Sequence, residues 1–283
     1  MKYLFKHMLG NVIIDDTGNV IGTAKSDTKL EELPYDLVQT VLENFKQTKY
    51  YSQLYTKNVA ITKKAIKESV NEDNVIVQTI STMTEVDRTI NLFTKRLREW
   101  YSVYYPELSQ EVSNHQKFVD MVLTQKRPKE TMGADLSNKD VTEMKRLAKH
   151  IQSLFQLRYE HETYLESIMK TYCPNITELA GVTIGAKLIE LGKSLKHLAM
   201  LPASTIQLFG AEKALFRHLK TGARSPKYGI IYEHQLIQKA KKSLRGKIAR
   251  VLADKLSLCA RLDYFKGEFK AKEYKKDLER KFG

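Results

Sequence analysis

The sequence has 283 residues and a net charge of +14, and 42% of its residues are hydrophobic. That hydrophobic content supports a packed core and excludes a disordered chain, and the length allows one large domain or two to three small ones. The charge is uneven, because residues 203–283 hold 20 Lys or Arg against 8 Asp or Glu, whereas residues 1–202 have a balance of only +2. One basic third on a nearly neutral chain is typical of a protein that binds a polyanion.

Simple sequence features exclude several classes of protein. Cys173 and Cys259 lie far apart and form no CxxC pair, which predicts two reduced thiols in a cytosolic protein. No apolar run approaches the length of about 18 residues that a membrane-spanning helix needs. The N-terminus carries Lys6 and His7 where a signal peptide would have its apolar core.

Residues 1–57 predict a small α/β unit. Short apolar or alternating runs surround a strong turn at 15–19, so we expect three strands, at 2–8, 12–14 and 20–21. Pro34 then opens a helix with one apolar face, formed by Leu37, Val38, Val41, Leu42 and Phe45. A unit of this size has little core of its own, so its apolar surface predicts a neighbour.

A helical arm is predicted over residues 58–172. Residues 58–104 contain no Pro or Gly, and their apolar residues fall into two rows spaced by seven, which is the seam of a coiled coil. The rows are Met83, Ile90, Leu97 and Tyr104 in one and Val86, Phe93 and Trp100 in the other. An unbroken helix of about 45 residues would be roughly 68 Å long, and Pro106 would end it.

A second heptad helix is predicted to begin at Ser137, where Ser137 and Asp140 form a start similar to a capping box. Its two rows are Met144, Ile151 and Leu165, and Leu147, Leu154 and Ile168. A shorter apolar helix with Val112, Phe118, Val119 and Val122, and a polar connection at 126–133, join the long helices, so we expect an antiparallel coiled coil. Arg158 and His161 interrupt the seam. Either they are a snorkelling Arg and a satisfied His, or they fix register or pairing.

Residues 173–283 predict an all-helical domain. Helical apolar residues run from Ile176 to Leu201, a helix follows from Leu236 through Arg245, and another spans Gly246–Phe265. Residues 267–283 are rich in Lys and Glu and indicate a strut or a frayed tail. Four cations lie outside the apolar face of the 246–265 helix, where they either bind a polyanion or are simply solvated: Lys247, Arg250, Lys255 and Arg261.

The stretch from Pro202 to His234 decides the functional interpretation. Gly210-Ala211-Glu212-Lys213 places a Gly and a cation where the chain turns into a helix, which residues 214–218 continue. Residues 221–229 then form a basic loop broken by Gly and Pro. Backbone N–H groups at a helix start, a Gly that lets phosphate approach, and surrounding Lys and Arg suit a nucleic-acid backbone. The alternative is an ordinary helix start followed by a solvated loop.

These residues resemble a known family. GAEKALFRH, the basic loop, PKYGIIYEH and the run Gly246-Lys247-Ile248-Ala249-Arg250 look like the Nop domain of the core scaffold protein of box C/D ribonucleoproteins, which is similar to a domain in a spliceosomal protein. The unbroken GAEK and ALFR segments favour the box C/D branch, in an archaeal-type form. The resemblance covers roughly residues 58–283, and the N-terminal domain looks shorter than that of the family.

The resemblance implies a mainly α scaffold with a small N-terminal α/β unit (1–57), a coiled-coil dimerisation arm (58–172) and an all-helical Nop domain (173–283). Its implied partners are a box C/D guide RNA, a small ribosomal-protein-like protein that binds kink-turns, and fibrillarin on the N-terminal unit. Fibrillarin would use S-adenosylmethionine for site-directed ribose 2′-O-methylation, so this chain itself needs no cofactor. The implied location is the cytoplasm of an archaeal-type cell, or the nucleolus in a eukaryote.

The resemblance also assigns residues. The expected RNA-binding residues are Gly210, Ala211, Lys213, Arg217, His218, Arg224, Lys227, Lys247, Arg250, Lys255 and Arg261. The expected residues of the dimerisation arm are Met83, Ile90, Phe93, Leu97, Trp100, Leu147, Ile151, Leu154 and Leu165. Leu215 and Phe216 fit the core as well as an RNA surface, and His218 either contacts a base or packs.

No catalytic constellation is recognisable. The seven His are scattered, with no HExxH, and neither GxSxG nor GxGxxG occurs, so we expect no metal and no enzyme activity. Gly192-Lys193 is not a phosphate loop, because Lys187 stands where that motif needs Gly. Three alternatives stay open: a spliceosomal-type Nop protein, a helical dimer that binds RNA through charge alone, and an unrecognised nuclease.

Overall fold

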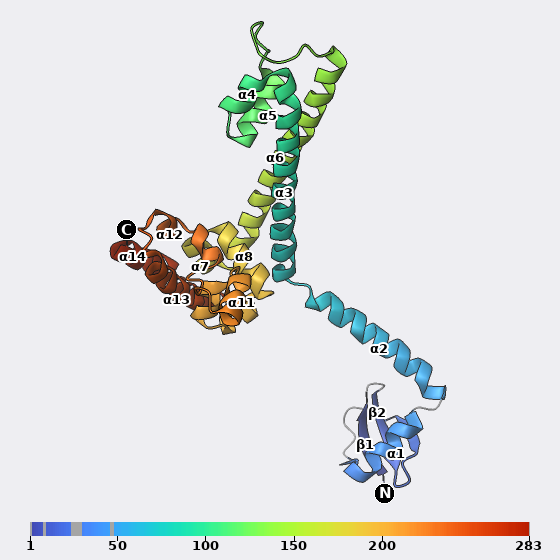
Figure 1. Cartoon of the computed structure of the whole chain (residues 1–283). Helices are drawn as coiled ribbons and strands as arrows, with labels where there is room; N and C mark the ends of the chain where they lie inside the picture. The colour runs from blue at the N-terminus through green and yellow to red at the C-terminus, as the bar shows by residue number, and fades with distance from the viewer. Residues whose placement is uncertain (1, 8–9, 24–29, 46–47, 283) are drawn as a thin grey trace. The chain divides into compact units, whose positions relative to one another are not determined.

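The computed structural model describes residues 2–7, 10–23, 30–45 and 48–282 (Figure 1). It divides into two compact units, Met1–Asn71 and Glu72–Gly283. The first unit holds a small sheet and the second is built from helices, so the mainly α fold class with an N-terminal α/β unit is confirmed.

The first unit is a four-stranded sheet with one helix packed on it. Its strands are β1 (Lys2–His7), β2 (Gly10–Asp15), β3 (Val20–Thr23) and β4 (Glu31–Glu32), in the order β3-β2-β1-β4. Helix α1 (Tyr35–Phe45) buries Val41 and Phe45 against Val12 and Ile14. The short strand β4 carries no apolar alternation, so the sequence pattern does not predict it. The expected end of the first strand, Met8, lies outside the described residues.

The unbroken helix predicted over 58–104 is wrong. Helix α2 (Thr48–Ser69) ends before Val70, and helix α3 (Glu72–Tyr104) begins after Asn71. Asp73 in the first turn of α3 is 4% exposed, and its carboxylate accepts a hydrogen bond of 2.9 Å from the backbone N–H of Leu195. The break therefore gives α3 a start of its own, whose acidic first turn suits a helix N-terminus.

Helices α3 and α6 (Asn138–Tyr172) pack along each other and form the arm (Figure 1). The start of α6 is as predicted: the Ser137 hydroxyl accepts from the Asp140 N–H at 3.3 Å and donates to the Asp140 carboxylate at 2.6 Å. One heptad row of each helix is fully or almost fully buried: Met83, Ile90 and Leu97 in α3, and Met144, Ile151 and Leu165 in α6.

The second predicted row of α3 is buried only at its start. Val86 is 8% exposed, whereas Phe93 and Trp100 are each 39% exposed. These two rings therefore lie at the edge of the pairing between α3 and α6 rather than inside it. Arg158 forms an ion pair of 2.7 Å with Asp87 of α3, so it links the two helices, as the pairing alternative predicted.

The far end of the arm is closed by two short helices, α4 (Pro106–Glu111) and α5 (His115–Thr124). Val112 ends α4, so the prediction that it shares one continuous helix with Phe118 is wrong. The guanidinium of Arg98 lies 4.2 Å from the centre of the Phe118 ring and donates to the carbonyls of Ser109 and Ser113, each at 3.1 Å. Arg98 thus holds both short helices against α3.

The remaining helices form a compact layer at the other end of the arm. They are α7 (Pro174–Ala180), α8 (Val182–Gly192), α9 (Leu195–Met200), α10 (Ala203–Leu208), α11 (Glu212–Thr221), the 3₁₀ turn η1 (Ile230–Glu233), α12 (Gln235–Lys239), α13 (Arg245–Tyr264) and α14 (Ala271–Phe282). Helix α13 is central, and its apolar face is buried at Ile248, Leu252, Leu256 and Ala260. The same core includes Ile80 and Leu165, so the arm and this layer share it.

Two predictions about the C-terminal helices are wrong. The helix that contains Leu236 ends at Lys239 instead of Arg245. The predicted strut or frayed tail is a docked helix, because α14 buries Ala271 and Leu278 almost completely against the rest of the unit. Its sparse apolar residues suffice, since they lie on one face.

The described part of the chain contains no helix long and apolar enough to cross a membrane. Among these residues there is also no group of three or more His, Cys, Asp or Glu that could hold a metal ion.

Candidate nucleic-acid interface

The GAEK segment forms a sharp turn into α11. Gly210 has a φ of +83°, and a Cβ on it would lie 3.4 Å from the backbone nitrogen of Ile230, so both the conformation and the space favour Gly. The Glu212 carboxylate accepts a hydrogen bond of 2.8 Å from the Gly210 N–H. Glu212 thereby holds the turn, and the exposed Lys213 follows it without a hydrogen bond or ion pair of its side chain in the described residues.

Helix α11 buries none of its residues. Phe216 is 67% exposed and Leu219 is 70% exposed, and Lys213 and Arg217 are exposed beside them. Of the two alternatives for Phe216, core or surface, the structure shows the surface. A short helix with exposed apolar and cationic residues is a surface on which another molecule can be held.

The basic loop after α11 is closed at its start by a hydrogen bond. Gly222 ends the helix with a φ of +67°, and its N–H donates to the carbonyl of His218. The Nδ1 of His218 is hydrogen-bonded to the carbonyl of Ala223. Because a carbonyl only accepts, Nδ1 carries the proton in this arrangement. His218 therefore has a structural role in the loop, beside which contact with a base through its other nitrogen stays a prediction.

The end of the loop is fixed to the segment that precedes α11. The side-chain amide of Gln207 donates to the carbonyl of Lys227 at 2.6 Å, and the N–H of Gly229 donates to the carbonyl of Gln207 at 2.8 Å. A Cβ on Gly229 would lie 1.9 Å from the carbonyl oxygen of Phe209, so this close approach requires Gly. Arg224, between the two fixed ends, is exposed.

Helix α13 carries the other expected cations, which differ in their surroundings. Lys247 and Arg250 are exposed near its start. Arg261 lies about 21 Å further along the helix axis than Lys247 at 1.5 Å per residue, and its Nε donates to the carbonyl of Ala199 at 3.2 Å. The ammonium of Lys255 lies 3.6 Å from Asp277 of α14.

The structure thus distinguishes free cations from engaged ones within the predicted set. In the described residues six of them have neither an acidic partner within ion-pair distance nor a side-chain hydrogen bond to the protein: Lys213, Arg217, Arg224, Lys227, Lys247 and Arg250. Lys227 joins the loop to α13, because a Cβ on Gly246 would lie 3.3 Å from the Lys227 side chain. The residues that motif matching missed are those that set this geometry, such as Gln207, whose role no sequence signal indicated.

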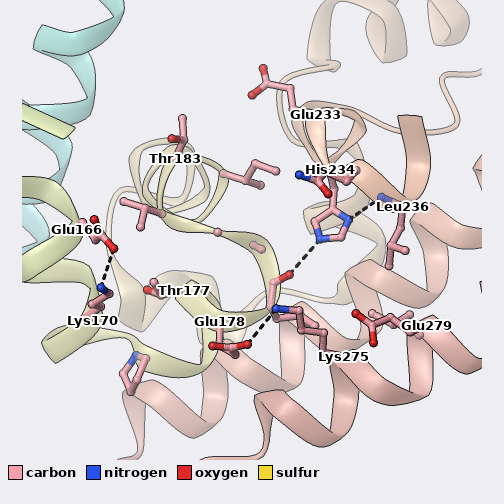
Figure 2. A pocket seen from close by; sticks show the side chains of 18 of the residues that line it. Glu166, Lys170, Thr177, Glu178, Thr183, Glu233, His234, Leu236, Lys275 and Glu279 are labelled. Carbon is pink, nitrogen blue, oxygen red and sulfur yellow. Dashed lines mark hydrogen bonds and ion pairs between the residues drawn. The ribbon is translucent and has the colours of Figure 1, made fainter. Parts of the chain in front are cut away.

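A hollow of about 910 Å³ lies among the same C-terminal helices (Figure 2). Unlike the surface of α11 and the basic loop, its described residues do not present a group of unpaired cations. Four of its charged residues form two ion pairs, Glu166–Lys170 at 2.6 Å and Glu178–Lys275 at 3.0 Å. His234 uses Nε2 to donate to the Leu179 carbonyl at 3.1 Å, and its Nδ1 accepts from a backbone N–H. Burial lowers the pKa of His234 below its ordinary value, and the charge of Lys275 adds to this. This histidine is held as a neutral structural group.

Known proteins match the chain over most of its length. A family model described as the Nop snoRNA-binding domain, fibrillarin, matches residues 82–131 and 123–283. A NOP5 family protein of Methanocaldococcus jannaschii is 40% identical over 246 residues, which are 78% of this chain and 59% of that protein. Nucleolar protein 56 of Caenorhabditis elegans is 34% identical over 245 residues, or 73% of this chain and 50% of the relative. The human nucleolar protein 56 is 35% identical over 229 residues, or 71% and 39%.

A solved structure has the same fold. In the crystal structure of a fibrillarin/Nop5p complex, one chain superposes with a TM-score of 0.50 at 25% identity and covers 100% of this chain and 98% of its own length. The chain spans about two to three fifths of the length of the curated relatives that it matches. Because the family model covers well over half of the residues, and the motif turn at Gly210 and the exposed helix α11 fall inside it, the chain belongs to the Nop family.

Proposed function

We propose that this chain is a scaffold subunit of a box C/D guide-RNA ribonucleoprotein. The observation that carries the proposal is the surface of α11, the loop at 222–227 and the start of α13, where exposed cations without acidic partners surround exposed apolar residues. Phosphates satisfy such cations, and the release of counterions makes the binding strong and dependent on salt. The matching family model, described as an snoRNA-binding domain, supports RNA as the ligand of this surface.

The RNA surface is proposed to be composite. The six free cations contact phosphates of a kink-turn guide RNA, which a small ribosomal-protein-like protein already holds. Phe216 and Leu219 then face the end of the duplex between guide and target, because an exposed aromatic ring and an aliphatic chain can cover a terminal base pair but not a phosphate. Lys255 and Arg261 contribute less, since protein groups already engage them.

Fibrillarin is the proposed partner of the N-terminal unit. The sheet presents Phe5, Val12 and Ile14 to α1, so the alternation along the strands turns Leu4 and Ile13 to the opposite face. Both are partly exposed there, and Ile21 on the edge strand is 53% exposed. This apolar face is the surface that a neighbouring protein would cover. The solved complex of fibrillarin with Nop5p, in which one chain shares this fold, supports that choice.

Two copies of the chain are proposed to pair through the arm. The buried heptad rows already pair α3 with α6 inside one chain, so they do not form the contact between copies. The exposed apolar residues of α3 are available instead: Leu92, Phe93, Trp100 and Val103. Sedimentation of the Trp100→Lys variant tests this, because a cation placed in an apolar contact between copies shifts the protein from dimer to monomer.

In such an assembly the chain acts through geometry. It holds RNA through its second unit and fibrillarin through its first, so that the methyltransferase with its S-adenosylmethionine lies over one ribose of the paired target. The chemistry belongs to the partner and the target nucleotide to the guide RNA. The assembly would be cytoplasmic in an archaeal-type cell and nucleolar in a eukaryote, as the name of the eukaryotic relatives suggests.

A gel shift at fixed salt tests the proposal. The RNAs are a kink-turn guide RNA and a scrambled duplex, each with and without the kink-turn-binding protein. We expect a supershift of the kink-turn RNA only when that protein is present. Equal, salt-sensitive binding to both RNAs would instead support a basic helical protein that binds by charge, which the balance of +12 in residues 203–283 favours as the second candidate.

Charge variants connect the test to the surface. The double variant Arg224→Ala/Lys227→Ala should lower the slope of log K against log salt by up to about 1.8, or roughly 0.9 for each lost phosphate contact. The charge-matched control is Lys126→Ala/Lys129→Ala, which removes two exposed cations from the connection between α5 and α6. Equal effects of the two double variants would show that only net charge matters.

A further inference from the structure

A stack of two tyrosine rings, with an arginine over one of them, lies at the end of the basic loop. The rings of Tyr228 and Tyr232 are nearly parallel, at 11°, with centres 5.0 Å apart. The guanidinium carbon of Arg245 lies over the Tyr232 ring, 5.5 Å from its centre. The stack therefore connects the end of the loop, the turn η1 and the first residue of α13.

The guanidinium of Arg245 is held by the protein through each of its three nitrogens. Its Nε donates to the Ala240 carbonyl at 3.0 Å, one terminal nitrogen donates to the Gln238 carbonyl at 3.2 Å, and the other donates to the Tyr232 hydroxyl at 3.2 Å. These bonds use three of the five N–H groups of the guanidinium and fix its orientation against the protein. Arg245 thus differs from Arg224, which is exposed and has no such partners among the described residues.

Lys227, the residue before the stack, is seated by the same elements. Its carbonyl accepts from the Gln207 amide at 2.6 Å, and its aliphatic chain lies across Gly246, where an added Cβ would be 3.3 Å from its Cδ. Gly246 directly follows Arg245. The stack therefore fixes Gly246, on which Lys227 rests, through the neighbouring Arg245, and it fixes Tyr228, which directly follows Lys227 in the chain. The ammonium of Lys227 stays without an acidic partner in the described part of the chain.

We infer that Tyr232 and Arg245 are positioning residues, which contact no RNA themselves and set the ammonium of Lys227 for an RNA phosphate beside Lys247. The inference rests on the proposed function, since it assigns roles within the same RNA surface. A lysine whose aliphatic chain already rests on the protein, as that of Lys227 does on Gly246, loses less conformational freedom on binding than a mobile one.

A double-mutant cycle tests the inference. The kink-turn guide RNA with its binding protein is titrated with the wild-type chain and with the variants Tyr232→Ala, Lys227→Ala and the combination of the two, at several salt concentrations. Tyr232→Ala removes no charge, yet it should weaken binding by about the same factor as Lys227→Ala and lower the salt slope by about 0.9. The double variant should be no weaker than either single variant, because both act through one contact.

Rescue separates positioning from a general loss of structure. Tyr232→Phe keeps the ring against Tyr228 and Arg245 and removes only one of the three hydrogen bonds of Arg245, so it should retain most of the affinity and the wild-type salt slope. A second variant avoids misfolding: Gly246→Ala favours the helix, since Ala is a better helix former than Gly. It should keep the melting temperature and still weaken RNA binding, because its methyl group displaces Lys227. In the matched control Gly192→Ala, the added Cβ meets only Leu198 at an ordinary 3.5 Å, and RNA affinity should not change.

Each contrary outcome has a distinct meaning. Additive losses in the double variant would show that Tyr232 contacts RNA directly and would overturn the positioning role. An unchanged affinity for Tyr232→Ala or Gly246→Ala, with Lys227→Ala still weakened, would overturn it while leaving the RNA surface intact. If Lys227→Ala bound RNA as tightly as the wild-type chain, Lys227 would contact no phosphate and the inference would be overturned. If the wild-type chain itself bound no RNA, the proposed function would be refuted.

Discussion

Asn175 should be one of the most sensitive single positions in the second unit, although nothing in its sequence context marks it. It is 2% exposed and its side chain joins three elements. Its Oδ1 accepts from the backbone N–H groups of Lys270 at 2.8 Å and Ala271 at 3.0 Å, so it caps the start of α14. Its Nδ2 donates to the carboxylate of Asp263 at 2.8 Å, and the same carboxylate accepts from the N–H of Ile176 at 2.9 Å at the start of α7.

The substitution Asn175→Ala removes the acceptor of two backbone N–H groups and one donor to a buried carboxylate. An unsatisfied buried donor costs ~1–3 kcal/mol and a lost bond to a charged group costs a similar amount. With about 1 kcal/mol for the partly buried N–H of Lys270, about 2 for the buried N–H of Ala271 and about 1.5 for the bond to the Asp263 carboxylate, the sum is about 4.5 kcal/mol. That loss is a large fraction of the ~5–15 kcal/mol that stabilises an ordinary domain.

Urea unfolding followed by tryptophan fluorescence measures this change. Trp100 is the single Trp of the chain and belongs to the second unit, so its signal does not report the first unit. The matched control is Asn138→Ala, at an exposed position in the first turn of α6, where a change within about 0.5 kcal/mol is expected. A loss below about 1 kcal/mol for Asn175→Ala would refute the reasoning, because it would show that the two N–H groups find other acceptors.

Three further predictions concern other buried groups. Because the pKa of His234 is lowered in the folded state, the unfolded chain binds the extra proton, so unfolding free energy should fall as pH drops below about 6.5, and His234→Gln should flatten that part of the pH profile. Burial raises the pKa of both Cys173 and Cys259 to about 12, so neither thiol should react with a thiol reagent at pH 8 until the protein unfolds, and fast labelling of the native protein would contradict this. Gly229→Ala should disrupt the loop, because its Cβ would overlap the Phe209 carbonyl. We expect a free energy of unfolding lower by about 1–3 kcal/mol, measured by urea unfolding, and weaker RNA binding.

Heptad spacing predicted the arm well, because periodicity reports which residues share a helix face. Met83, Ile90 and Leu97 are buried as expected. Periodicity does not report how much of that face the partner helix covers. Helix α6 covers only part of the predicted seam of α3, and Phe93 and Trp100 are left at its edge. Their exposure depends on the partner helix, so the row they occupy could not have revealed it.

The missed helix break has a different cause. The absence of Pro and Gly over 58–104 predicts continuity, whereas a helix also ends when tertiary contacts favour a new start. The carboxylate of Asp73 is bonded to Leu195, more than a hundred residues away. A contact of that sequence separation leaves no local pattern. The acidic pair Glu72-Asp73 after Asn71 was the available local signal, since it is typical of a helix N-terminus.

The surface of α11 shows most clearly what sequence motifs can and cannot supply. The sequence indicated a helix with apolar and basic residues, and that much is confirmed. Whether Phe216 faces the core depended on whether another element covers it. Left-handed glycines, Gly210 and Gly222, flank the helix, and none of its residues is fully buried, although Leu215 and His218 are only partly exposed. The exposed face of the helix, which carries Phe216 and Leu219, gains nothing from burial within its own chain. Exposed apolar residues of this kind fit the proposed binding of a molecule from outside, and the cations beside them favour an anionic one.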